Sequence, residues 1–362
     1  MPEWLDRLYN ARAINNDLPA QARNEELQRM YRAYGEIVNS IVADRDTGQM
    51  NADRAARLLS SIRDQLDRIR DTIPQALQSQ LEDLGGRIAN EHVDAIRAAV
   101  QRAGADISVA TSFDDVPQEV LSNIMRRRGL GLSDSYRSLI GFWHQGSTQD
   151  VDRYLTQAIG RGIPVGRAKR ELAAVIVRGD ERIRPYLSRE ARGTLPDVDL
   201  GPVDTPERTR QLLVNTRRII VSEVNTTNDE AHRLSGERSP VVRYLKWEVS
   251  GRHYGLNSSP DECTIYHEED LYGYGPGLYR PENKPALPHP NCACRVSFVT
   301  RPPNEWNEPL PEPNAPQVSY DANTVQDLIN SRGGSIGTQG AGSMAERINA
   351  NNRMAHRMYV EI

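Results

Sequence analysis

All three cysteines of the chain lie in its C-terminal half, and two histidines accompany them. The first group is in DECTIYHEED and the second, about twenty residues further along, is in LPHPNCACRV. The side chains that could bind a transition metal are Cys263, His267, His289, Cys292 and Cys294. Zinc takes four such ligands in a tetrahedron, usually from two short clusters that the fold brings together. The spacing therefore predicts a structural zinc site formed by four of these five residues.

The same five residues are also compatible with a segment that holds no metal. Thiols in a reducing cytosol can be free and half-buried. Cys263 could instead form a disulfide with Cys292 or Cys294 after release into an oxidising medium. His289 lies between two prolines and could simply hydrogen-bond within a turn. The acidic residues after His267 are more typical of an exposed turn than of a hard-metal site.

Catalysis is not indicated by the sequence. A cysteine nucleophile needs a base and oxyanion donors, and nothing flanking Cys292 suggests them. The sequence has no GxSxG, no P-loop, no GxGxxG after a predicted strand and no HExxH. We therefore expect a protein that is not an enzyme.

Composition points to helices and to surfaces that a partner covers. The 362 residues are 38% hydrophobic and 26% charged, with only three phenylalanines. The net charge of -4 gives no overall case for nucleic-acid binding. The basic run Arg126, Arg127 and Arg128 is the local candidate for DNA phosphates, although such runs are more often solvated helix faces. We expect neither a secretory signal nor a membrane span, because no long apolar stretch is present.

Helical periodicity dominates residues 1–105. Apolar residues recur at alternating steps of three and four at Leu58, Ile62, Leu66, Ile69, Ile73, Leu77, Leu81, Leu84 and Ile88. This narrow stripe predicts a helix pair inside one chain or a coiled-coil seam between subunits. Pro74 and the pair Gly85-Gly86 are expected to kink or interrupt the run.

The remaining sequence divides into three regions. Residues 106–200 predict a middle helical region, and residues 201–301 predict a helix followed by a small β unit that carries the cysteines. In SPVVRYLKWEVSG, alternation places Val241, Arg243, Leu245, Trp247 and Val249 on one strand face, and RVSFV predicts a second strand.

The last region, residues 302–362, is rich in proline and glycine. It predicts an extended tail in which RPPNEWNEPLPEPNAPQ has no core of its own, RGGSIGTQGAGS is a flexible linker, and two short helices lie between and after these stretches. Such a tail is either disordered or ordered along a partner. The expected fold class is α+β and predominantly α-helical.

Four segments follow one another between Ile219 and Val299: VSEVNTTNDEAHR, YLKWEVSG, SPDECTIYHEEDLYG and PALPHPNCACRVSFV. This order resembles the phage Mu F-like family of minor head, or head-morphogenesis, proteins. That family has an acidic-Asn helix, a strand with tryptophan, a loop with cysteine or histidine pairs, and a closing H-P-N-C-x-C. This chain departs from the pattern at His267, where a second cysteine is common one position earlier, and at Ala293, where a basic residue is usual.

The resemblance implies a structural component of a tailed-phage virion. Members of the family associate with the portal vertex and the head interior in a few copies, and they act in head assembly and in DNA packaging or delivery. The implied partners are the phage portal protein, the major capsid or scaffolding protein, and packaged DNA. Assembly would take place in the host cytoplasm, with no membrane partner.

Two further functions stay open at this point. One is a DNA-contacting internal protein that is ejected with the genome and binds phosphates through Arg126, Arg127 and Arg128. The second is an enzyme packaged in the head, either ADP-ribosyltransferase-like or a nuclease. The roughly sixty residues after Arg301 are too few and too open to enclose a dinucleotide.

Overall fold

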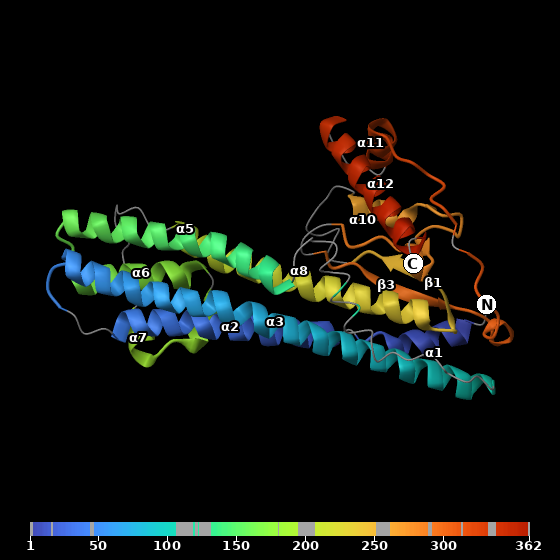
Figure 1. Ribbon diagram of the computed structural model, residues 1–362, viewed down its shortest axis with the longest axis horizontal. Helices are drawn as coiled ribbons and strands as arrows, with labels where there is room; N and C mark the ends of the chain where they lie inside the picture. The colour runs from blue at the N-terminus through green and yellow to red at the C-terminus, as the bar shows by residue number, and fades with distance from the viewer. Residues whose placement is uncertain are drawn as a thin grey trace. The chain divides into compact units, whose positions relative to one another are not determined.

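The computed structural model describes most of the chain (Figure 1). The described residues are 3–15, 17–43, 47–105, 119, 122, 132–179, 181–194, 207–250, 261–288, 292–312, 314–331 and 338–360. Within them the protein is predominantly helical, with a three-stranded antiparallel sheet, so the predicted α+β class is confirmed. None of the described helices combines the length and apolar composition that a membrane crossing requires.

The chain forms two compact units, and each unit is assembled from separate stretches of sequence. Unit 1 comprises Met1–Ala20, Leu81–Ile124 and Ser222–Ile362, and unit 2 comprises Gln21–Gln80 and Met125–Val221. Helices α2 (Asp17–Ala43), α3 (Ala52–Ala103) and α8 (Glu207–Arg238) contribute residues to both units. Residues 1–105 therefore contribute to both units.

Helix α3 is continuous over 52 residues. The expectation that Pro74 or Gly85-Gly86 would interrupt it is wrong, since all three residues lie inside the helix. The predicted apolar stripe is confirmed, because all nine of its positions from Leu58 to Ile88 are buried by the chain itself. The apolar stripe stays on the same buried face before and after Pro74. Burial of that face on both sides of the proline offsets the cost of a proline inside a helix, which is about 3 kcal/mol.

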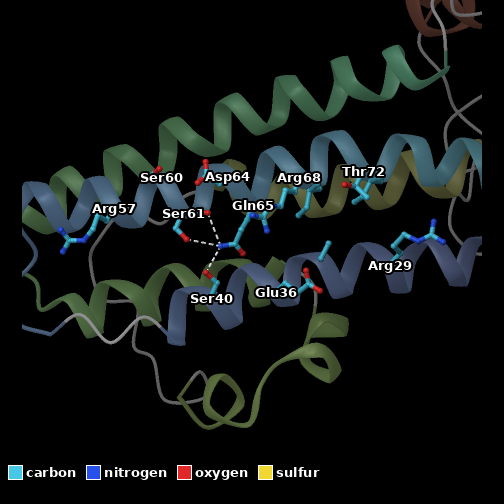
Figure 2. Close-up of a pocket in the computed structure, with 13 residues that line it drawn as sticks. Arg29, Glu36, Ser40, Arg57, Ser60, Ser61, Asp64, Gln65, Arg68 and Thr72 are labelled. Carbon is cyan, nitrogen blue, oxygen red and sulfur yellow. Dashed lines mark hydrogen bonds between the residues drawn. The ribbon is translucent and has the colours of Figure 1, made fainter.

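Unit 2 adds helices α5 (Leu132–Gly160), α6 (Val165–Gly179) and α7 (Arg189–Thr194), and the 3₁₀ helix η1 (Glu181–Tyr186). A cavity of about 830 Å³ lies between α2 and α3. Figure 2 shows Gln65 at its centre, where the amide Nε2 donates to Ser40 Oγ at 2.7 Å and to Ser61 Oγ at 3.3 Å. The side chains that line this cavity include no cysteine or histidine.

The sheet belongs to unit 1, and its strand order is β2-β1-β3. Strands β1 (Val242–Glu248) and β3 (Arg295–Thr300) correspond to the two predicted strands, whereas β2 (Leu278–Tyr279) has no predicted counterpart. The predicted alternation holds at Leu245 and Trp247, which are both buried. It fails at Arg243, which is half-buried, because the register shifts between Val242 and Tyr244.

The C-terminal region packs onto unit 1. Helices α11 (Ala322–Ser331) and α12 (Thr338–Val360) bury Val325, Ile329, Met344 and Ile348 in the same core as Trp247 (Figure 1). The linker prediction is wrong for residues 338–343, which form the start of α12.

The proline-rich stretch before α11 is also bound to unit 1. Arg280 donates to the carbonyl of Pro311 at 2.8 Å, and the Asn314 amide donates to the carbonyl of Tyr272 at 2.8 Å. Trp306 is buried, and its indole N–H donates to the carbonyl of Arg301 at 2.8 Å. Because proline supplies no N–H, this stretch is held through its carbonyls and through side chains rather than by a strand ladder.

Gly277 tests how tightly β2 is joined to helix α10 (Glu262–Glu268). Its φ is 68°, and a Cβ there would lie 2.5 Å from the His267 carbonyl oxygen. Gly162 has a φ of 64° with nothing within 4 Å of the same position. We expect Gly162→Ala to cost about 1 kcal/mol and Gly277→Ala about 3 kcal/mol, because only the second adds a backbone clash. Equilibrium denaturation of both variants measures this difference, and equal costs would contradict it.

Candidate metal centre

Cys263 is held by the first turn of α10. Asp261 is the N-cap, and its carboxylate accepts hydrogen bonds from the backbone N–H groups of Cys263, at 2.9 Å, and Thr264. The Thr264 hydroxyl in turn accepts a bond from the Asp261 N–H, which completes a capping box. Cys263 itself is fully buried. The cap therefore fixes the direction in which the Cys263 side chain points away from the helix.

Cys292 and Cys294 lie in the extended stretch that leads into β3. Residues two apart in an extended chain project to the same side, so both thiols can face α10. The side-chain amide of Asn225, on α8, donates to the Cys292 carbonyl at 2.7 Å. This contact holds the backbone of the cysteine stretch against α8, the helix that precedes the sheet.

The three thiols form one buried group. Their Sγ atoms all lie within 4.8 Å of one another, and Cys263 Sγ is 3.5 Å from Cys292 Sγ. None of the three cysteines forms a disulfide in the structure. A disulfide would bring two sulfurs to about 2.05 Å and leave the third aside. Two thiolates on one tetrahedral zinc, with Zn–S bonds of about 2.3 Å, are about 3.8 Å apart. The observed spacing is therefore close enough to hold a metal ion.

The electrostatics of the group favour neutral thiols in the protein alone. Contact with Cys292, then contact with Cys294 and burial, raise the pKa of Cys263 far above its usual value. For Cys294, contact with Cys263 lowers the pKa, but contact with Cys292 and burial outweigh it and raise the pKa to about 12. Thiols with raised pKa values are poor nucleophiles. A divalent cation at the same place would reverse the effect, since it favours the thiolate form.

One backbone group is also aimed at the sulfurs. The N–H of Ser250, just after β1, hydrogen-bonds Cys294. Hydrogen bonds of this kind to sulfur are common around metal-bound thiolates and tune the charge that the ligands carry. The sequence alone does not identify Ser250, Asn225 or Asp261 as neighbours of the thiols. Of these, only Asp261 has a readable signal, the D-x-x-T capping pattern before an apolar stretch.

The predicted ligands do not all come together. Cys263, Cys292 and Cys294 form the group, whereas His267 does not join it. His267 is half-buried on α10, with Nδ1 2.7 Å from the backbone carbonyl oxygen of Trp247. His289 lies outside the described residues, as do Arg126, Arg127 and Arg128. The group is also embedded in the core that contains Trp247, so its surroundings are apolar.

Comparisons with known proteins give no relative from which a ligand could be inferred. No family model, curated protein or solved structure matches the chain. The site is therefore assigned from its own geometry.

The α10 cap gives a direct test of how Cys263 is positioned. Asp261→Ala removes the acceptor for two backbone N–H groups and should cost about 1 kcal/mol of folding stability. Asp261→Asn keeps an acceptor oxygen and should retain most of that stability. Reaction of the native protein with an aromatic disulfide reagent should also be faster in Asp261→Ala, because the helix start loosens around Cys263. Unchanged thiol reactivity in a destabilised Asp261→Ala variant would show that the cap does not position the cysteine.

Proposed function

We propose that this protein is a structural head-morphogenesis protein of a tailed bacteriophage, and that its cysteine group binds one zinc ion per chain. The observation that supports it best is the buried group of Cys263, Cys292 and Cys294. These residues come from the two sequence segments whose order resembles the Mu F-like pattern. In this proposal the protein acts at the portal vertex or inner capsid, in head assembly and DNA packaging or delivery.

The surroundings of the thiols favour a structural site over a catalytic one. Catalytic zinc keeps an open position for water or substrate, whereas structural zinc is enclosed by protein ligands. Here the three cysteines are at most 7% exposed and lie in an apolar core. Three thiolates also suit zinc better than magnesium or calcium, which prefer oxygen ligands.

A metal at this position would cross-link two segments whose cysteines Cys263 and Cys292 are 29 residues apart in sequence. Cys263 lies at the start of α10, and Cys292 and Cys294 lie just before β3. The sheet has only three strands, and one of them contains two residues. Small sheets of this size need packing or cross-links to be stable. A zinc ion held by both segments would supply that stability to a protein that assembles with partners.

The fourth ligand is assigned to His289 rather than to His267. His267 is not grouped with the cysteines, and its Nδ1 lies 2.7 Å from the Trp247 carbonyl oxygen, which leaves only Nε2 for a metal. His289 is three residues before Cys292 in the sequence, which is a common spacing for ligands of one metal.

Metal content tests the site. We expect the reduced, purified protein to carry one zinc by elemental analysis. Cys263→Ser, Cys292→Ser and Cys294→Ser should each lose most of it, with a lower thermal midpoint that added zinc does not restore. His289→Gln should weaken zinc binding at least tenfold, and His267→Gln, the matched control, should leave it unchanged. A wild-type protein without zinc, whose three thiols titrate freely, would overturn the metal assignment.

Partner binding tests the role in the head. We expect the full-length protein to co-sediment with rings of the portal protein encoded by the same phage, and not with an unrelated ring of similar size. The zinc-free cysteine variants should bind more weakly because the β unit is less stable. A compact monomer that binds neither portal nor capsid protein would overturn the assembly role even if zinc is present. The two parts of the proposal can therefore fail separately.

A further inference from the structure

Helix α1 (Glu3–Ala13) covers the outer edge of strand β3. Because the strand order is β2-β1-β3, no strand of the described part of the chain lies beside the outer edge of β3. The Asn10 side chain fills that place at Phe298: Oδ1 accepts the Phe298 N–H at 2.7 Å, and Nδ2 donates to its carbonyl at 2.7 Å. A side-chain amide thus makes the pair of bonds that a neighbouring strand would make.

One turn earlier on α1, Asp6 binds the next outward-facing residue of the strand. Its Oδ1 accepts both the backbone N–H of Thr300, at 2.7 Å, and the Thr300 hydroxyl, at 2.6 Å. Residues four apart lie on one helix face, and residues two apart lie on one strand edge, so the two spacings match. Three backbone groups of the β3 edge are therefore satisfied by α1.

Helix α1 is tied to the rest of unit 1 by a buried chain of hydrogen bonds. The Tyr9 hydroxyl donates to Ser239 Oγ at 3.1 Å and lies 3.0 Å from His92 Nδ1. His92 Nε2 in turn lies 3.1 Å from His232 Nδ1. Tyr9 has one proton, which goes to Ser239, so His92 must donate from Nδ1 to the Tyr9 oxygen. His92 Nε2 is then an acceptor, and His232 donates to it from Nδ1.

This arrangement has no place for another proton between the rings. A proton on His92 Nε2 would face the N–H of His232, and both histidines are buried. Burial, then His232, lower the pKa of His92 well below the usual 6.5. Burial, then the Lys284 cation, lower the pKa of His232 to about 4.

The other groups packed around the two rings do not compensate a new positive charge. Phe298 contacts both rings through its apolar side chain. Lys284 is already paired with Asp229 at 2.7 Å, so that carboxylate is engaged. Tyr9 and Ser239 contribute neutral hydroxyl groups. Among the described residues, the groups facing the pair therefore favour the neutral histidines.

We propose that α1 is an acid-released strap over the edge of β3, and that the His92–His232 pair sets the pH of its release. With the strap docked, both rings are neutral and Asn10 and Asp6 satisfy the strand edge. A proton added to the pair leaves a buried positive charge in contact with Tyr9, and the water that enters when α1 leaves would solvate that charge, so protonation favours the released state. Release uncovers a strand edge of the kind that pairs with an extended segment.

The direction of the pH effect follows from the two protonation equilibria. His92 is on α3 and His232 is on α8, and Tyr9 of α1 covers His92. When α1 leaves, water reaches this site and the pKa of the pair moves back toward the usual 6.5, whereas in the docked state both rings stay neutral to a lower pH. The released state therefore binds more protons in the window between about 6.5 and 4, and docking weakens as the pH falls through it.

Residue-resolved amide hydrogen exchange of the full-length protein between pH 7.5 and 4.5 tests the proposal. The amides of Phe298 and Thr300 report docking of α1, because they donate to α1 side chains. By alternation along the strand, the amides of Ser297 and Val299 face β1 and report the sheet itself. After correction for intrinsic exchange, we expect protection to fall at least tenfold at Phe298 and Thr300 below pH 6, with Ser297 and Val299 still protected.

Three variants separate the trigger from other titrating groups. His92→Gln and His232→Gln keep polar groups but cannot take up a proton, so the acid loss of protection should move by at least one pH unit or disappear. Asp6→Asn keeps the acceptor oxygen but removes the carboxylate, and it should leave the midpoint unchanged. A midpoint that moves only in Asp6→Asn, or simultaneous loss of protection at all four amides in the wild type, would overturn the proposal. Neither the amide protection nor the pH midpoint of its loss depends on zinc or on a partner.

Discussion

Burial of three sulfur atoms in mutual contact is the constraint on which the rest of unit 1 depends. Cys263, Cys292 and Cys294 lie in the core that also contains Trp247, Tyr266 and Tyr279 from the β unit and residues of α11 and α12. Neutral thiols are weakly polar and can be accommodated in such a core, whereas thiolates cannot be buried together without a cation. The same packing is therefore tolerable as three thiols and strongly favourable as three ligands of one metal. Either way, the segments around it must meet at this point, because the capping box of α10 and the Asn225 contact hold both sides in place.

A second set of buried charges holds the loop between β2 and the cysteines. The side chain of Lys284 is fully buried, and it donates to Asp229 at 2.7 Å and to the Pro285 carbonyl at 2.9 Å. Its ammonium group also lies 4.7 Å from the centre of the Trp247 ring. Removing one partner of such a buried pair typically costs about 3–5 kcal/mol, because the other charge is left without compensation. The loop is thus fixed to α8 by charge and to β1 by the tryptophan, so the stretch that leads to Cys292 starts from a defined place.

Much of this architecture could be predicted from periodicity, and the parts that could not depend on contacts between distant residues. The stripe from Leu58 to Ile88 predicts its buried face correctly, because a helical repeat is a local property. The prediction that Pro74 interrupts the helix fails because the local penalty of proline is smaller than the gain from burying the apolar face on both sides of it. The prediction at the start of α12 relied on the glycine-rich composition of that stretch. It fails because the apolar residues that α11 and α12 bury in the core stabilise the helix despite its glycines.

The candidate site shows the same division. Three of its five predicted ligands come together in the structure. These three could be predicted because cysteines are rare in the chain and their positions already indicate a cluster. His267 is indistinguishable from a ligand in the sequence, since only the fold reveals that its ring meets the Trp247 carbonyl. The role of α1 has no local signal at all. Asp6 and Asn10 are ordinary polar residues of a helix until β3 is placed beside them.

Strand β3 is where these constraints meet. One end of it follows the cysteine stretch, and its outer edge is completed by α1, whose bonding partners are 288 and 294 residues away in sequence. Such long-range pairs form late in folding, since the entropy of closing a long loop must be offset first. During synthesis α1 appears first, but Asn10 and Asp6 have no strand to bind until residues 295–300 have been made. The structure around β3 therefore depends on segments from both ends of the chain.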